Sequence, residues 1–385
     1  MDRKGSGSRP LRVAMLGHKR IPSREGGIEV VVQELGARLV ELGCEVTCYN
    51  RGGHHVSGKE FDTGNAKEYM GIRLKSVLTI DKKGLAAMTS SFFGAICCAF
   101  GKYDVVHFHA EGPAFMCWLP KLFGKRVVVT VHGLDHQRAK WGRLASAYIM
   151  AGERNAVKYA DEIIVLSESV RQYFKDTYGR DTVCIPNGVK RPEKMRAELI
   201  RERYQLEQDS YILFLGRIVP EKGLRYLLEA FQSVQTEKKL VIAGGSSDTD
   251  GFLGELKGMA EADPRILFTG FVQGRPLEEL YSSAYVYVLP SDLEGMPLSL
   301  LEAMSYGNCC LVSDIPECAD VIEDHGVTFR RGNAQDLRDK LQMLCDGPEA
   351  VERYSLEAAD FICGKYAWDD MARETLDLYG RLYGG

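Results

Sequence analysis

Two glutamates and the start of a helix gather within Ser291–Gly307, which reads SDLEGMPLSLLEAMSYG. The short apolar run before it, Tyr285–Pro290, predicts a buried strand. Pro297 stands where a helix can begin, because the N–H that proline lacks is not needed at the first helical position. We therefore expect Glu294 in the turn after the strand and Glu302 inside the helix.

This strand-to-helix turn offers the groups that would bind a nucleotide sugar. Carboxylates accept hydrogen bonds from the hydroxyls of a sugar and of a ribose, and free N–H groups at a helix start bind phosphate. A nucleotide sugar contains all three parts, namely a sugar, a diphosphate and a ribose. A helix that starts at a proline and carries two solvated glutamates is the alternative that this segment leaves open.

A pair of cations follows another predicted strand. Gly216-Arg217 ends this strand, and Glu221-Lys222-Gly223 leads into the next helix. The arginine offers a planar fork for phosphate oxygens, whereas the lysine offers a compact charge. Two cations at the edge of a sheet would offset the charge of a diphosphate leaving group, although a solvated basic turn has the same composition.

A glycine pair opens the first long helix. The loop His18–Glu25 leads to Gly26-Gly27-Ile28-Glu29, and an amphipathic helix is predicted from about Ile28 to Leu42. Glycines let the backbone approach a ligand closely, and a helix start adds N–H groups and about half a positive charge. An ordinary flexible turn is the alternative.

Histidines end two neighbouring predicted strands. His132 ends one of them, with Asp135 close behind, so it should lie at the rim of a cleft. His107 and His109 alternate on the strand before it and could share one face, as in a metal site. No third ligand is evident near them in the sequence, and we expect no metal here.

One motif is of the kind that holds a divalent metal on a nucleotide sugar elsewhere. Asp248-Thr249-Asp250 has the DxD form. Its loop, Gly244–Gly251, is rich in Gly, Ser and Asp, which is typical of a solvated turn. We therefore expect no metal at this motif either.

The bulk properties restrict the class of protein. A chain of 385 residues predicts two domains, and 45% hydrophobic with 26% charged residues is typical of a soluble globular protein. The net charge of −4 argues against a dedicated nucleic-acid binder. The 11 cysteines are scattered and form no CxxC pair, which favours free thiols in a reducing, cytoplasmic compartment. The first ten residues lack the apolar core of a signal peptide and predict a flexible tail.

Strand-like and helical segments alternate along the whole chain, which predicts parallel sheets in an α/β fold of two doubly wound, Rossmann-like domains. Several strands are continuous apolar runs, as expected when both faces are covered. The predicted strands are Val13–Gly17, Val46–Tyr49, Ile72–Val77, Val105–His109, Val127–His132, Ile163–Ser167, Val183–Pro186, Ile212–Gly216, Leu240–Gly244, Ile266–Phe271, Val286–Pro290, Cys309–Ser313 and Val327–Phe329.

The pattern restarts after Pro186-Asn187-Gly188. We predict a tail over 1–10, a first domain over 11–187, a second over 188–365 and a last helix over 366–385 that packs back across the junction. Ligands of such sheets bind beyond the carboxyl ends of the strands, which places the cleft between the domains. The charge-free segment Gly84–Gly101 is too polar for a membrane span, so we expect a buried helix there, with membrane insertion as the alternative.

These clusters together resemble a retaining glycosyltransferase of family 4, with the two-domain GT-B architecture. The resemblance covers the chain from Val13 to the last helix. Its motifs are Glu294 to Glu302 as the E-x7-E signature, Gly216-Arg217 with Lys222-Gly223 as the diphosphate-binding pair, Gly26-Gly27 as the glycine loop, and Pro186-Asn187-Gly188 as the interdomain segment. The runs His132–Asp135 and Arg138–Gly142 are similar to the bacterial branch that builds capsule, exopolysaccharide and rhamnose-rich polymers.

The resemblance implies catalytic roles for four residues. Glu294 would contact the donor sugar and stabilise positive charge at the reacting carbon, and His132 would touch the sugar near that carbon. Arg217 and Lys222 would bind the diphosphate. Retention in this family is thought to proceed on one face of the sugar, with the leaving phosphate helping to deprotonate the acceptor.

The resemblance also implies the residues that bind the donor and the acceptor. Glu302 would hold the ribose hydroxyls, Phe271-Val272 would meet the base through their backbone, and Gly26-Gly27 would approach the donor. Many relatives have an aromatic residue and glycine where this chain has Met296-Pro297. Since Pro297 has no N–H, phosphate contacts would fall to Met296, Leu298 and Ser299. The expected acceptor side consists of Glu29, His109, Asp135, Arg138 and Lys140.

We therefore predict transfer of a sugar from a nucleoside diphosphate to a hydroxyl of a growing, lipid-linked bacterial glycan, without a metal or other cofactor. Arg138, Lys140, Trp141 and Arg143 could form a basic lip toward the inner face of the membrane. A nucleotide-sugar epimerase or hydrolase and a non-catalytic assembly subunit remain alternatives. A dinucleotide oxidoreductase is disfavoured, since neither half has G-x-G-x-x-G after its first strand. The sequence leaves the base, the sugar and the acceptor open.

Overall fold

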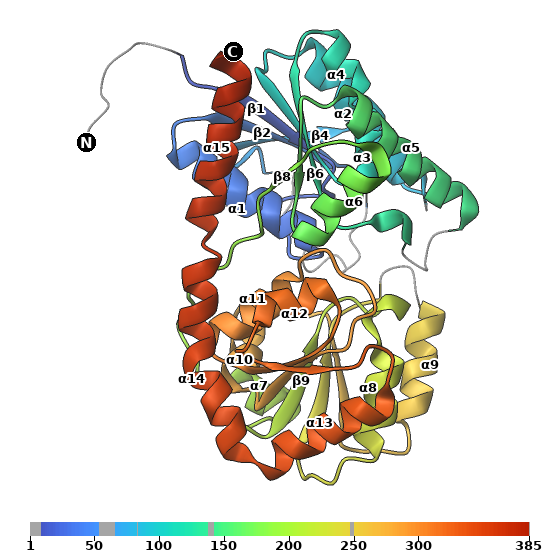
Figure 1. The fold of residues 1–385 in the computed structure, drawn as a ribbon, viewed down its shortest axis with the longest axis vertical. Helices are drawn as coiled ribbons and strands as arrows, with labels where there is room; N and C mark the ends of the chain where they lie inside the picture. The colour runs from blue at the N-terminus through green and yellow to red at the C-terminus, as the bar shows by residue number, and fades with distance from the viewer. Residues whose placement is uncertain (1–8, 54–65, 83, 138–141, 247–249, 385) are drawn as a thin grey trace, which may run out of the picture.

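The computed structural model describes residues 9–53, 66–82, 84–137, 142–246 and 250–384. It consists of two α/β domains, each built around a largely parallel sheet, and they lie one above the other in Figure 1. The predicted tail falls mostly on residues 1–8, outside the described part of the chain. Residues 54–65, which include His54-His55, also lie outside it.

The first domain contains an eight-stranded sheet in the order β3-β4-β2-β1-β5-β6-β7-β8. Every described pairing is parallel except that of β3 with β4. The continuous apolar runs of its central strands are buried because helices cover both faces. The strands are β1 (Arg12–Leu16), β2 (Glu45–Arg51), β3 (Glu68–Tyr69), β4 (Ile72–Val77), β5 (Val105–His109), β6 (Arg126–Val131), β7 (Glu162–Val165) and β8 (Val183–Cys184).

The helices of the first domain pack against this sheet. They are α1 (Gly27–Glu41), α2 (Leu85–Phe100), α3 (Glu111–Ala114), α4 (Trp118–Leu122), the 3₁₀ helix η2 (Asp135–Gln137), α5 (Arg143–Tyr159) and α6 (Glu168–Tyr178). The valines and leucines of α1 recur at helical spacing, so one face of the helix enters the core beside β1.

The second domain contains a six-stranded, fully parallel sheet in the order β11-β10-β9-β12-β13-β14. Its strands are β9 (Tyr211–Leu215), β10 (Lys239–Ala243), β11 (Ile266–Gly270), β12 (Val286–Leu289), β13 (Cys309–Ser313) and β14 (Val327–Phe329). Its helices are α7 (Leu199–Tyr204), η3 (Pro220–Lys222), α8 (Leu224–Gln232), α9 (Asp250–Ala260), α10 (Arg275–Ser283), α11 (Leu298–Ser305), α12 (Pro316–Ile322), α13 (Ala334–Asp346) and α14 (Pro348–Lys365).

The last helix, α15 (Trp368–Gly384), leaves the second domain and lies along the first (Figure 1). Trp368, Met371 and Tyr379 are buried in the same apolar cluster as residues of β1 and α1. The hydroxyl of Tyr379 lies 2.6 Å from Nδ1 of the buried His107. Chain that follows the second domain therefore completes the core of the first.

Each sheet has a point where the strand order reverses, between β1 and β5 in the first and between β9 and β12 in the second. Ligands of open parallel sheets bind beyond the strand ends at such points. The two sheets present these ends to each other, since turns that follow β6 and β8 contact the turn that follows β12. We refer to the region where these strand ends face each other as the groove between the domains.

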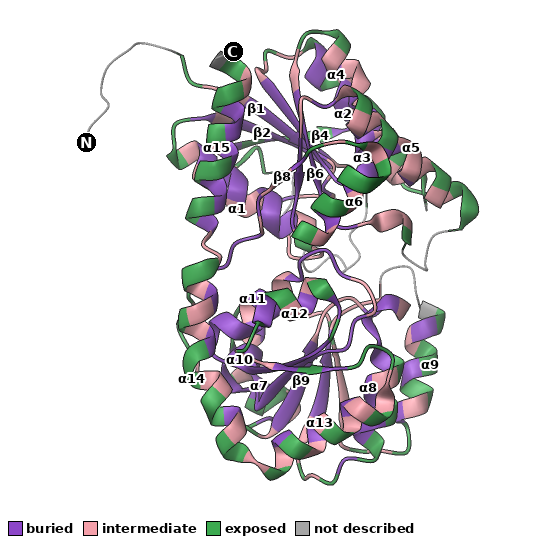
Figure 2. Cartoon of the chain, viewed as in Figure 1, coloured by how far each residue is buried: buried purple, intermediate pink, exposed green. Residues whose placement is uncertain are grey.

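The expectation of a buried helix over Gly84–Gly101 is wrong for one of its faces. The described helix, α2, buries its small residues, and Figure 2 shows exposed segments along it. Exposed apolar side chains are Leu85, Met88, Phe92 and Phe100. None of the described helices combines the length and the apolar run that crossing a membrane requires.

The docking of α15 can be tested through its buried hydroxyl. We expect Tyr379→Phe to lower the free energy of unfolding by about 1–3 kcal/mol, because Nδ1 of the buried His107 loses its partner. The control is Tyr383→Phe on the same helix, where the side chain is exposed, and we expect a change within about 0.5 kcal/mol. Urea unfolding measures both variants. Equal stability of Tyr379→Phe and the wild type would show that this contact does not hold the helix.

Candidate active site

A buried ion pair lies at the strand-order reversal of the second sheet. Nζ of Lys222 lies 2.5 Å from Oε1 of Glu294, and the hydroxyl of Ser291 donates to the same oxygen at 2.6 Å. Gly223 holds the lysine turn in place: its φ is +67°, and a Cβ atom there would lie 1.8 Å from the carbonyl oxygen of Pro290. The turn after β9 is thus pressed against the end of β12 because glycine alone fits between them.

Arg217 and Phe271 follow strands β9 and β11, on the other side of this reversal from β12. Arg217 comes directly after β9 and Gly216, and Phe271-Val272 come directly after β11, all of them half-buried. Gly244 joins these loops, since a Cβ atom there would lie 1.8 Å from the carbonyl oxygen of Gly216, and its N–H donates to Gly270 at 2.9 Å. The predicted diphosphate and base contacts therefore lie at one sheet edge.

Residues of both domains contact the carboxylate of Glu302. One of its carboxylate oxygens forms an ion pair with Arg24 of the first domain, and the other accepts a hydrogen bond from the hydroxyl of Tyr281 at 3.1 Å. Leu298, one turn earlier on α11, packs against the cores of both domains. A Cβ atom at Gly27 would lie 3.6 Å from Leu298, so the glycine pair of the first domain faces α11.

The backbones of the two domains also approach each other closely. A Cβ atom at Gly295 would lie 1.8 Å from the carbonyl oxygen of His132. Gly133 has a φ of +140°, and a Cβ atom there would lie 3.1 Å from Cα of Gly295 and 3.7 Å from the carbonyl oxygen of Glu294. His132 is consequently beside Glu294 in space, as a shared site requires.

Three histidines extend from this contact into the first domain. His109 Nδ1 lies 3.0 Å from Nε2 of His132, and its ring stacks on that of His107 at 4.2 Å. Burial lowers the pKa of His107 to about 3 and that of His109 well below its usual range. Burial likewise lowers the pKa of His18, which is bonded to Asn50, to about 4. These imidazoles are therefore neutral at pH 7, and His107 and His109 lie behind His132 without adding charge.

The predicted acceptor-side residues differ in how far they are buried. His109 is completely buried, so it can act on a ligand only through His132. Glu29 is also buried, and its carboxylate accepts the N–H of Lys19 at 2.7 Å, which orders the loop before the glycine pair. Asp135 lies in η2 and donates its N–H to Glu111. Arg138 and Lys140 fall outside the described residues, as do Trp141 and most of the DxD motif.

Met296, which stands where many relatives have an aromatic residue, contacts the interdomain segment through Asn187. The N–H of Asn187 contacts the sulfur of Met296 at 3.1 Å, and its side-chain amide donates to the carbonyl oxygen of Met296 at 3.1 Å. Ser299 accepts a hydrogen bond from Tyr287 at 2.8 Å. The segment between the domains thus holds the start of α11 directly.

Sequence reasoning missed several residues that complete the site. These are Arg24, Tyr281, Ser291 and Gly295. Asn187 was placed in the interdomain segment, but its partner Met296 was not predicted. Ser291 stands three residues before Glu294, a spacing that allows the contact without indicating it. Nothing in the sequence around Arg24 identifies Glu302 as its partner.

Taken together, cations, carboxylates and close backbone line one groove between the domains. Lys222 and Arg217 offer positive charge, Glu294 and Glu302 accept hydrogen bonds from hydroxyls, and the glycine pair faces them from the first domain. Such a groove can bind a diphosphate between two hydroxyl-bearing rings, and it can stabilise the charges that separate when a glycosyl–phosphate bond breaks.

Comparison with known proteins agrees with this chemistry. Residues 25–191 match the family model Glycosyltransferase Family 4, and residues 196–360 match Glycosyl transferases group 1. A D-inositol 3-phosphate glycosyltransferase of Xylanimonas cellulosilytica is 27% identical over 97% of this chain and 98% of its own.

Solved structures show the same fold. Sucrose-phosphate synthase from Thermosynechococcus elongatus has a TM-score of 0.81 at 20% identity, over 98% of this chain and 100% of its own. Anabaena HepE, in complex with UDP and glucose, has a TM-score of 0.80 at 13% identity, over 97% of this chain and 100% of its own. The chain is a GT-B glycosyltransferase, with a family 4 amino-terminal half and a group 1 carboxyl-terminal half.

Proposed function

We propose that this enzyme transfers a sugar, with retention, from a nucleoside diphosphate to a hydroxyl of a lipid-linked glycan during synthesis of a bacterial surface polysaccharide. The observation that carries the transfer step is the Lys222–Glu294 pair, buried at the reversal of the second sheet and beside the His132–Gly133 turn of the first. This arrangement puts a cation, a carboxylate and the turn that carries His132 next to one another.

The charges of the groove fit the charges of the reaction. Breaking a glycosyl–phosphate bond leaves negative charge on the diphosphate and positive charge on the sugar carbon. Arg217 and Lys222 would stabilise the first, and Glu294 the second. Preorganised charges of this kind are usually the largest contribution to catalysis. No cofactor beyond the donor is part of this proposal.

The ribose would take the place of Arg24. Glu302 is the implied ribose ligand, and Arg24 holds it across the groove. The Arg24 side chain is 35% exposed, so it can leave without unpacking a core. The hydroxyls of a ribose would then donate hydrogen bonds to this carboxylate, and the freed guanidinium would face the incoming nucleotide.

The donor and the acceptor are narrower parts of the proposal. Anabaena HepE binds UDP and glucose on the same fold, which supports a UDP-hexose as the first donor to test. Transfer of rhamnose to a wall polymer rests on the runs His132–Asp135 and Arg138–Gly142 alone. Thermal-shift screening against UDP, dTDP and GDP sugars distinguishes these donors.

An exposed apolar face supports a lipid-linked acceptor. The face is formed by α2 and α4, which pack on each other, and Phe100 meets Phe123 with their ring centroids 4.7 Å apart. Contiguous apolar surface of this kind marks interaction sites. Its exposed side chains are Leu85, Met88, Phe92, Phe100, Leu122 and Phe123.

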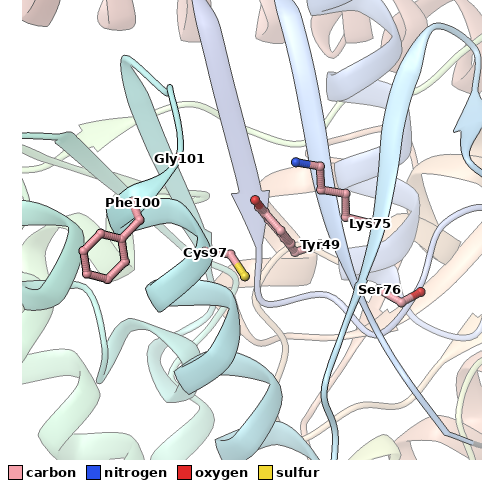
Figure 3. Close-up of a pocket in the computed structure, with 6 residues that line it drawn as sticks. All are labelled: Tyr49, Lys75, Ser76, Cys97, Phe100 and Gly101. Carbon is pink, nitrogen blue, oxygen red and sulfur yellow. The ribbon is translucent and has the colours of Figure 1, made fainter.

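Lysines accompany the apolar face. Lys102 is exposed at the end of α2, and Lys121 and Lys125 are half-buried around Phe123. A hollow of about 520 Å³ lies alongside (Figure 3), with Phe100 on the α2 side and Lys75 and Tyr49 on strands β4 and β2. Apolar side chains ringed by lysines fit the interface of an anionic bilayer.

The catalytic roles predict large losses of activity. We expect Arg217→Ala and Glu294→Ala each to lower turnover by about 10²–10³-fold, because each removes a charge that acts on the transition state. Release of nucleoside diphosphate with and without acceptor measures this and separates transfer from hydrolysis or epimerisation. The controls are Arg225→Ala and Glu255→Ala, an exposed ion pair of the same domain. Near-normal rates in folded Arg217 and Glu294 variants would refute these roles.

The contact between the backbones predicts a second loss. We expect Gly295→Ala to leave both domains folded and to lower turnover by about 100-fold, because the added methyl group forces His132 and Glu294 apart, and displacement of reacting groups by about 1 Å has that effect. Gly254→Ala on α9 is the control, since the methyl group there meets no atom within 4 Å. Equal turnover of Gly295→Ala and the wild type would contradict the closeness of the two turns.

Membrane binding is tested separately from catalysis. We expect the wild type to sediment with vesicles of phosphatidylglycerol and phosphatidylcholine, and the double variant Phe100→Ser/Phe123→Ser to bind at least about tenfold more weakly, since each buried aromatic ring contributes about 1.5–3 kcal/mol. Leu356→Ser on α14 is the control, because Leu356 and Phe100 are equally exposed, at 71%. A wild type that stays in solution at moderate salt would remove the membrane from the proposal.

A further inference from the structure

We propose that Glu111, His136 and Glu153 bind a divalent transition-metal ion in the first domain, at a site separate from the donor-binding residues. Three elements supply them: Glu111 begins α3, His136 lies in η2 and Glu153 lies on α5. One ligand atom from each residue lies within 4.8 Å of the other two. Neither the transfer chemistry nor the membrane surface uses any of them.

Each residue has a ligand atom that makes no hydrogen bond to a described residue and lies near the other two, although Nδ1 of His136 and Oε2 of Glu153 are also close enough for an ion pair. Oε2 of Glu111, Oε2 of Glu153 and Nδ1 of His136 are buried, and none has a hydrogen-bond partner among the described residues. Both glutamates are completely buried. Buried polar atoms without partners are rare in folded proteins, and an ion is one of the few things that can satisfy three at once.

The second oxygen of each carboxylate is anchored. Oε1 of Glu111 accepts the N–H of Asp135 at 3.1 Å. Oε1 of Glu153 accepts the hydroxyls of Tyr173, at 3.0 Å, and of Tyr178, both on α6. Hydrogen bonds from outer groups are what orient the ligands in metal sites. One oxygen of each carboxylate is thereby fixed and the other is left available.

The charge of the cluster also calls for a cation. Two carboxylates in a completely buried space repel each other and lose their hydration, which is costly unless a positive charge or a proton compensates. Burial, with the charge of Asp135, raises the pKa of Glu111 well above its usual range. A proton shared between Glu111 and Glu153 is therefore the rival explanation, and it makes a different prediction from an ion.

The ligand set and its spacing favour zinc or manganese over magnesium or calcium. Imidazole with carboxylates suits the former, whereas Mg²⁺ and Ca²⁺ prefer oxygen ligands only. Tetrahedral zinc, with bonds of about 2.0–2.1 Å, sets two ligand atoms about 3.4 Å apart. Nδ1 of His136 and Oε2 of Glu153 are 3.4 Å apart.

Close packing keeps the site assembled. A Cβ atom at Gly152 would lie 1.9 Å from the carbonyl oxygen of Glu111, so α5 touches the start of α3 with no room for a side chain. An ion here would tie η2 to both helices. Since η2 follows the His132–Gly133 turn, the ion would hold the acceptor-side wall of the groove, without entering the reaction.

The test uses the full chain, freed of metal by a chelating resin, and titrates ZnCl2, MnCl2 and MgCl2 by calorimetry and thermal shift. Exposed Cys97 can bind zinc by itself, so the site is judged by the difference between the wild type and His136→Gln. We expect the wild type to bind one more equivalent of Zn²⁺ or Mn²⁺ than this variant, and to gain thermal stability that the variant does not gain. Mg²⁺ should do neither.

Two further variants separate the ion from the shared proton. We expect Glu153→Gln to weaken ion binding at least about tenfold, and His325→Gln, which alters a histidine paired with one exposed glutamate, to bind like the wild type. If Glu153→Gln does not fold, Glu111→Gln is used in its place. Equal ion binding by the wild type and His136→Gln overturns the proposal, as does a metal-free Glu111→Gln variant that is as stable as the zinc-loaded wild type.

Discussion

The site depends on one steric constraint, the contact between Gly295 and the His132–Gly133 turn. No side chain fits at position 295, because its Cβ atom would overlap the carbonyl oxygen of His132. This contact fixes how closely the carboxyl ends of the two sheets approach. Arg24 at Glu302 and Asn187 at Met296 support the same approach from either side. As a result, helix α11 of the second domain faces the glycine pair of the first.

Within this groove, electrostatics and burial act together. The Lys222–Glu294 pair is buried, so each charge is costly without the other and their geometry is fixed. The neutral histidines behind His132 add no competing charge, since burial lowers the pKa of His107 and His109. Lys222, which is paired with Glu294, and Arg217 are the cations that the proposal assigns to the diphosphate. The same first domain carries the apolar face of α2 and α4, which would place the groove close to a lipid-linked acceptor.

The sequence predicted the strands well because they are continuous apolar runs bounded by glycine or polar residues. Ile72–Val77, Val105–His109 and Cys309–Ser313 agree with β4, β5 and β13 residue for residue. Helix α11 begins at Leu298, so Pro297 is its N-cap and not, as predicted, its first residue. The strand ends then placed Arg217, Lys222 and Glu294 at one sheet edge, because parallel strands share their direction.

The same reasoning could not identify partners that are distant in the chain. Arg24 and Glu302 are 278 residues apart, and neither carries a local sign of the other. Helix α2 was misjudged because lack of charge does not separate a buried apolar face from an exposed one. A crystal structure with UDP tests the central claim most directly. We expect the diphosphate against Arg217 and Lys222, and the ribose on Glu302 with Arg24 displaced. A nucleotide bound elsewhere, with the Arg24–Glu302 pair intact, would contradict the account.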